Sequence, residues 1–179
     1  EKLLLRYASK VYMFKHSKFN LPFVLTMLYI HIGALGAFFF PFKIEYFYVG
    51  LFNYLWFGYA SSLYYHRYLT HRGFEMVRPL QFFYLLGGLI GLSGDPVSWV
   101  TIHRYHHQNS DTEHNIHSPR QGWLYSYYGW YLRADPKFYE LHRPRAQDIR
   151  QHWYIRAAEG VLASFVVHSA YLFLTYYFL

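Results

Sequence analysis

The stretch LPFVLTMLYIHIGALGAFFF, from Leu21 to Phe40, contains twenty residues and no charged side chain. At 1.5 Å per residue, an α-helix of this length is about 30 Å long, which matches the hydrocarbon core of a bilayer. A short charged link separates it from a second uncharged stretch at residues 46–65, and a third apolar stretch occupies residues 155–179. The sequence therefore predicts an all-α integral membrane protein with three transmembrane helices.

The composition agrees with this class. Hydrophobic residues make up 54% of the chain and charged residues 15%, against roughly 25% charged residues in average soluble domains. The absence of cysteine from the sequence excludes disulfides, zinc ribbons, iron–sulfur clusters and thiol nucleophiles. No Pro/Gly/Ser-rich linker divides the 179 residues, so we expect a single domain over 1–179.

Basic residues give the expected orientation. Five Lys and Arg residues precede the first apolar stretch, Lys43 alone lies in the link, and eleven fall between Arg67 and Arg156. By the positive-inside rule, the N-terminus and residues 66–154 face the cytoplasmic or stromal side. The net charge of +7 is spread between apolar stretches, which favours contact with anionic lipid headgroups and argues against nucleic acid as a partner.

Two short histidine clusters lie on this side of the membrane, His66-Arg67-Tyr68-Leu69-Thr70-His71 and His103-Arg104-Tyr105-His106-His107. The second cluster follows a helix start, because Asp95 is a good N-cap and Pro96 suits the first helical position. On a helix from residue 96 to about 107, its three imidazoles point into one sector.

The first cluster has a different spacing. His66 and His71 are five residues apart, which is about 140° on an ideal α-helix. They could straddle one centre or serve two metals, but a straight α-helix would not let both bind one ion, so we expect two metals. Neutral imidazole suits zinc, copper, iron and nickel, and the residue types alone do not choose among them.

His31 and His168 lie inside the expected membrane spans. An ionisable side chain at that depth is a functional candidate. We expect neutral, hydrogen-bonded packing roles for both, with ligation of a haem or pigment as the alternative.

The motifs from about residue 46 to 130 resemble the membrane fatty-acid desaturases of the delta-9 type. They are HRYLTHRGF, GDPVSWVTIHRYHHQNSDTE, HSPRQG and Gly129-Trp130. The sequence around GDPVSW and HRYHHQ is most similar to that of plastid and cyanobacterial acyl-lipid enzymes. The resemblance implies four membrane helices and a cytoplasmic-side cap of interfacial helices, here residues 66–154, that holds two non-haem irons. It assigns the metal ligands to His66, His71, His103, His106 and His107.

The resemblance also implies an activity. It is the oxygen-dependent introduction of a double bond into an acyl chain, with electrons from ferredoxin or cytochrome b5, in a plastid, thylakoid or bacterial membrane or alternatively in the endoplasmic reticulum. The Arg-Asp pair that precedes the second histidine box in acyl-CoA enzymes is Thr101-Ile102 here, which favours an acyl chain carried on a lipid. At the position where the family has Asp-Pro-His, this chain has Asn115-Ile116-His117.

The resemblance covers only the front half of such an enzyme. The family needs a third HxxHH-type box with further ligands, which this sequence lacks, and five histidines cannot complete two iron spheres. We therefore expect a further C-terminal segment with a fourth membrane helix, and no activity from this polypeptide alone. The alternatives are a related di-iron hydroxylase or ketolase, and an inactive desaturase-like subunit of a larger membrane complex.

Overall fold

The computed structural model describes residues 19–110, 112, 114–133 and 135–178, and these form helices and turns with no strand among them. The predicted all-α class is therefore confirmed. The chain divides into two compact units, one containing Tyr105–Leu141 and the residues up to Phe42, the other containing Lys43–Arg104 and the residues from His142. The single desaturase-like domain over 1–179 stays a prediction. The basic residues before Phe19, on which the expected orientation partly rests, lie outside the described residues.

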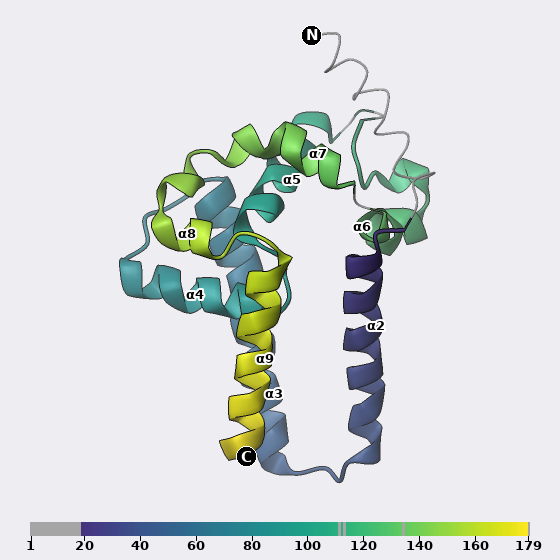
Figure 1. Cartoon of the computed structure of the whole chain (residues 1–179), viewed down its shortest axis with the longest axis vertical. Coiled ribbons are helices and arrows are strands. Elements are labelled where there is room, and N and C mark those ends of the chain that lie inside the picture. The colour runs from purple at the N-terminus through teal and green to yellow at the C-terminus, as the bar shows by residue number, and fades with distance from the viewer. Residues whose placement is uncertain (1–18, 111, 113, 134, 179) are drawn as a thin grey trace. The chain divides into compact units, whose positions relative to one another are not determined.

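The first unit contains the long helix α2 (Leu21–Gly36), drawn in purple in Figure 1, which the 3₁₀ turn η2 (Ala37–Phe39) extends. Its first turn carries a proline, where no intrahelical N–H bond is lost. The backbone N–H of Asn20 donates to the carbonyl of Leu132 at 2.7 Å, and Phe23 stacks on Tyr131 with ring centroids 4.4 Å apart. These contacts hold the start of α2 against helix α6 (Trp130–Leu132).

The rest of the first unit consists of short helical segments. The end of α5 (Pro96–Asn109) belongs to it, and Tyr105 packs edge-on against Phe138 with ring centroids 4.9 Å apart. The other segments are η4 (Pro119–Gln121), η5 (Tyr125–Gly129) and α7 (Pro136–His142).

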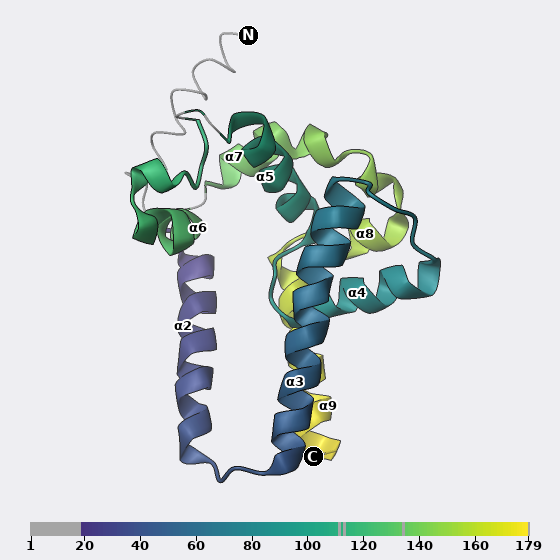
Figure 2. The ribbon, with the colours of Figure 1, turned by 180° about the vertical axis from the view of Figure 1, so that it is seen from behind.

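The second unit is built on helix α3 (Ile44–Tyr59), its continuation η3 (Ala60–Thr70), α4 (Arg78–Ile90) and α9 (Val161–Phe178). The Tyr171 hydroxyl of α9 donates to Asn53 Oδ1 of α3 at 2.7 Å, and Figure 2 shows α4 extending away from these two helices. The Trp56 indole donates to the carbonyl of Phe83 in α4 at 2.9 Å. The buried core of this unit gathers side chains from α3's continuation, α4, α5 and the segments after residue 142: Tyr64, Tyr65, Leu69, Leu85, Leu89, Val97, Val100, Ala146, Ile149, Tyr154, Ile155 and Ala158.

Two helices are long and apolar enough to cross a membrane, Leu21–Phe39 and Val161–Phe178. The first agrees with the expected span at 21–40. The expected span at 46–65 falls on α3 and the start of η3, which do not meet the same criterion among the described residues. The prediction of three transmembrane helices is therefore not confirmed, because two helices of the described residues meet the criterion of length and apolar composition.

The expected third span begins too early. Helix α8 (Trp153–Ala157) ends where the chain turns at Gly160, whose φ is +94°, and α9 starts only at Val161. Glu159 forms ion pairs with Arg143 at 2.5 Å and Arg150 at 3.1 Å. These pairs fix the turn, and the left-handed backbone at Gly160 is one that glycine adopts without a Cβ clash. Residues 155–160 are thus the end of α8 and the turn that follows it, and are not part of the long helix α9.

Candidate metal centre

The histidines of the first cluster are brought together by a π-helix. In η3 backbone bonds join residues five apart, and the His71 N–H accordingly donates to the carbonyl of His66 at 3.2 Å. Residues five apart therefore share a face, and the Nε2 atoms of His66 and His71 are 3.1 Å apart. The expectation that these side chains diverge was wrong because it assumed α-helical geometry.

This spacing suits two ligands of one ion. Two imidazole nitrogens each about 2.1 Å from an ion, as in zinc sites, lie about 3.0 to 3.4 Å apart when they subtend about 90 to 110° at it. The separation of 3.1 Å between the Nε2 atoms falls in this range. His66 and His71 can therefore chelate one ion, which the sequence did not indicate.

Helix α5 supplies a third imidazole. Its start is the predicted one, since Asp95 Oδ1 accepts hydrogen bonds from the backbone N–H groups of Val97 at 3.0 Å and Ser98 at 2.9 Å. Two turns later, the His103 ring lies 4.6 Å from the His66 ring and 5.6 Å from the His71 ring, centroid to centroid. The ligand nitrogens of these histidines all lie within 4.8 Å of one another.

An indole covers one side of these imidazoles. Trp99, one turn before His103 on α5, has its ring centroid 4.7 Å from that of His103 and 6.3 Å from that of His66. His66 and His103 are half-buried, and His71 is exposed. Partial desolvation, then the neighbouring His66 and Arg104, lower the pKa of His71, and this favours the neutral imidazole that a metal requires.

His106 and His107 belong to the first unit. Asn115, which is 2% exposed, directs its Oδ1 at His106 Nδ1 over 3.0 Å and also accepts the backbone N–H of His117 at 3.2 Å. Because this oxygen only accepts, His106 Nδ1 carries the proton, and its Nε2 presents the lone pair. His107 is exposed and lies one turn after His103 on the same helix.

His117 packs flat against His106, with ring centroids 4.2 Å apart. Burial, followed by the proximity of His106, lowers the pKa of His117 to about 4. His117 is therefore neutral at physiological pH. The sequence did not mark Asn115 or Trp99 as site residues, although Asn115 stands where the resembling family has aspartate.

The residues that follow the histidines carry a second feature that the sequence did not reveal. Asp148 accepts hydrogen bonds from Arg104, which follows His103, and from Arg72, which follows His71. Partial burial alone would raise the pKa of Asp148, but the hydrogen bonds and charges of both arginines outweigh it and lower the pKa to about 2. Asp148 is therefore a fixed anion between the two histidine segments.

This pKa predicts how stability depends on pH. A carboxyl group with a depressed pKa stabilises the fold fully above its unfolded value of about 3.9, and that contribution is lost as the pH falls toward 2. We expect the Tm of wild-type protein in detergent to exceed that of Asp148→Asn at pH 6, and the difference to shrink steadily between about pH 4 and 2. A difference that is constant over this range would contradict the assignment.

The two histidines of the apolar helices have backbone partners. His31 Nδ1 lies 2.7 Å from the carbonyl of Met27, and His168 Nδ1 lies 2.5 Å from the carbonyl of Ile90. Both carbonyls are acceptors, so each Nδ1 donates. The hydrogen bonds are present as expected, and the packing roles of both histidines stay predictions.

Comparisons with known proteins point to one enzyme class. The chain is 29% identical to delta-9 acyl-lipid desaturase 1 of Arabidopsis thaliana over 92% of this chain and 53% of that protein. It is 35% identical to the sn-1 stearoyl-lipid 9-desaturase of Anabaena variabilis over 66% of this chain and 44% of that protein. It is 38% identical to the icosanoyl-CoA 5-desaturase of Limnanthes douglasii over 62% of this chain and 32% of that protein. No family model and no solved structure matches the chain.

These matches confirm the resemblance drawn from the histidine motifs. The chain is homologous to the fatty-acid desaturases, and among them to delta-9 and acyl-lipid desaturases of plants and cyanobacteria. It spans about half, or less, of the length of these curated relatives.

Proposed function

We propose that this chain is the front half of a membrane-bound, non-haem di-iron desaturase that introduces a double bond into a lipid-linked acyl chain. The observation that carries the proposal is the convergence of His66, His71 and His103, whose ligand nitrogens lie within 4.8 Å of one another. The homology to fatty-acid desaturases supports the assignment of a desaturase metal centre to this group of imidazoles.

The side chains fit an iron site. Imidazole nitrogen is among the ligands that suit iron, and the lowered pKa of His71 favours its neutral form. In the proposed centre His66, His71 and His103 hold one ion, and Trp99 covers two of their rings and limits the access of water. When bound, iron would supply the oxygen-dependent removal of hydrogen from an unactivated acyl chain.

His106 and His107 are proposed as further ligands. The Asn115 carbonyl oxygen accepts the Nδ1 proton of His106, which places the lone pair of this ring on Nε2, and His107 follows His103 by one turn of α5. The remaining ligands of two irons would come from a part of the enzyme outside this sequence. Electrons from ferredoxin or cytochrome b5 are part of the same proposal.

The proposed location is a membrane of a plastid, thylakoid or bacterium, crossed several times, with the histidines on the cytoplasmic or stromal side. Two apolar helices support it, and so does α3, which buries none of its residues within the structure. A lipid-linked substrate is supported by Thr101, which is uncharged and 1% exposed where acyl-CoA enzymes have arginine. Relatives act, by name, on lipid-linked and on CoA-linked chains.

The proposal is tested by expressing the full-length protein in a desaturase-deficient host and analysing its acyl lipids. We expect a new double bond in lipid-linked chains and about two irons per purified protein. A hydroxylated or keto product would identify the related oxygenase instead. Absence of both iron and product would favour an inactive, desaturase-like subunit of a larger membrane complex. No contact among the described residues specifically supports that alternative.

A further inference from the structure

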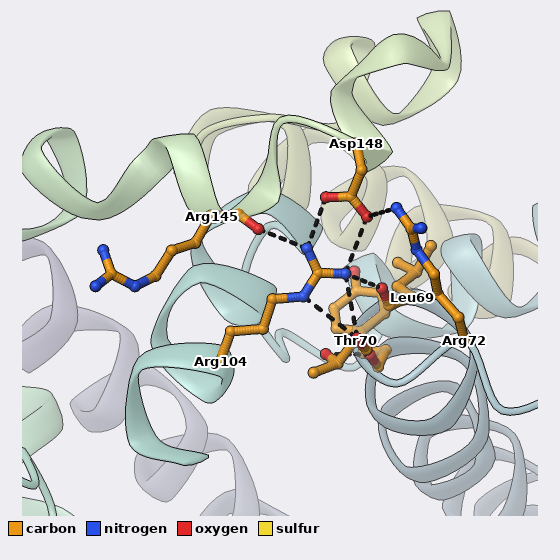
Figure 3. Close-up of polar contacts among 7 residues, drawn as sticks. Leu69, Thr70, Arg72, Arg104, Arg145 and Asp148 are labelled. Atoms are coloured by element: carbon orange, nitrogen blue, oxygen red, sulfur yellow. Dashed lines mark hydrogen bonds and ion pairs between the residues drawn. The ribbon is translucent and has the colours of Figure 1, made fainter. Parts of the chain in front are cut away.

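The guanidinium of Arg104 uses all of its N–H groups within the second unit (Figure 3). Nε donates to the carbonyl of Thr70 at 3.3 Å, and Nη2 donates to the carbonyls of Leu69 at 2.9 Å and Thr70 at 3.1 Å and to Asp148 Oδ2 at 3.0 Å. Nη1 donates to the carbonyl of Arg145 at 2.5 Å and to Asp148 Oδ1 at 2.6 Å. The Arg104 side chain therefore joins three segments: its own helix α5, residues 69–70 and residues 145–148.

The position of these bonds in the chain relates them to the histidines. Leu69 and Thr70 immediately precede His71, whereas Arg104 immediately follows His103. The Arg104 side chain is thus bonded to the backbone that carries one imidazole, and its own backbone carries the other.

Asp148 closes the arrangement from the other side. Its Oδ2 accepts from Arg72 Nη2 at 2.5 Å, and Arg72 immediately follows His71. Arg72 has a φ of +52°, a left-handed conformation that is unfavourable for a non-glycine residue. Figure 3 shows Arg72 and Arg104 approaching the Asp148 carboxylate from two sides.

We propose that Arg104 is a positioning residue, whose guanidinium holds His66 and His71 at the distance from His103 that binding of one metal ion requires. The inference rests on the proposed metal centre and assigns a determinant of its affinity. Asp148 orients the guanidinium and neutralises its charge. The backbone carbonyls of Leu69 and Thr70 are the points at which it acts.

The planar fork is the property that matters, because a lysine ammonium has three donors at a single point and cannot reach the acceptors at residues 69–70 and those at residues 145–148 at once. Arg104→Lys keeps the positive charge beside Asp148 and removes the fork. Arg143→Lys is the matched control, since Arg143 lies in the same unit and pairs with Glu159 at 2.5 Å. Both variants make the same chemical change at an ion pair.

The experiment measures Co²⁺ binding to the full-length protein in detergent, purified through a tag without histidine, by equilibrium dialysis and visible absorption. Substituting residues that orient metal ligands typically weakens metal affinity about 10- to 100-fold, and we expect a loss of this size for Arg104→Lys with an altered Co²⁺ spectrum. We expect Arg143→Lys to bind Co²⁺ with the affinity of wild type, because it leaves the fork of Arg104 intact. Asp148→Asn, which retains one acceptor oxygen, is the second variant if Arg104→Lys folds poorly, and we expect a weaker affinity for it as well.

Hydrogen exchange of the metal-free protein provides a second readout. The amides of His71, Arg72 and Gly73 close the π-helix by bonding to the carbonyls of His66, Tyr68 and Arg67. We expect Arg104→Lys to accelerate exchange at these amides and to leave exchange in α9 unchanged. Unchanged exchange at all of them would overturn the positioning role.

The outcomes separate this inference from the proposed function. If wild-type protein binds no Co²⁺, the metal centre itself is wrong. If wild type binds and Arg104→Lys binds equally tightly, the metal centre stands and the role of Arg104 is overturned. Equal weakening by Arg104→Lys and Arg143→Lys would also overturn it, because the effect would then be a general loss of stability.

Discussion

His103→Ala is expected to weaken Co²⁺ binding to the full-length protein by at least about 100-fold, beyond the roughly 10- to 100-fold range of residues that only orient ligands. The His103 ring lies 4.6 Å from the His66 ring and 5.6 Å from the His71 ring. Its removal leaves His66 and His71 as the converging imidazoles of this unit. Equilibrium dialysis and the visible spectrum of Co²⁺ measure the loss.

His152→Ala is the control for this prediction. His152 packs on Tyr154 with ring centroids 5.3 Å apart and is exposed, and it is not part of the group whose ligand nitrogens converge. We expect its Co²⁺ affinity to equal that of wild type. Retention of wild-type affinity by His103→Ala would show that these imidazoles do not hold the ion.

Gly88→Ala is expected to give the largest loss of stability. A Cβ at this position of α4 would lie 2.6 Å from Cζ and 2.7 Å from the hydroxyl oxygen of Tyr65. Tyr65 is fully buried, and its hydroxyl donates to the carbonyl of Gly94 at 3.2 Å, so the ring cannot move away freely. Overpacking of this kind costs about 1 to 3 kcal/mol, which we expect to appear as a lower midpoint of thermal unfolding in detergent.

The matched control is Gly50→Ala on α3, where an added Cβ meets nothing within 4 Å. Alanine is the better helix former by about 1 kcal/mol, so this variant should be as stable as wild type or more stable. Equal midpoints for Gly88→Ala and Gly50→Ala would mean that α4 does not pack on Tyr65 as described. Co²⁺ affinity of the folded Gly88→Ala protein separates a packing defect from a defect at the histidines.

The sequence by itself determined the features that depend on residue type and local period. Apolar runs of membrane length predicted α2 and α9, the latter with a start placed too early, and Asp95-Pro96 predicted the start of α5, because caps and apolar length act within a few neighbouring residues. The spacing of the histidines, together with the surrounding motifs, was enough to indicate the desaturase relationship that the comparisons bear out.

The tertiary structure decided what the histidines can do together. His66 and His71 share a face because residues 60–70 adopt π-helical bonding, whereas the sequence pattern implies the commoner α-helix. Arg104 reaches the carbonyls of Leu69 and Thr70, more than thirty residues earlier in the chain. A backbone carbonyl is present whatever the side chain is, so no residue pattern marks it as an acceptor, and only the folded path of the chain brings it to the guanidinium.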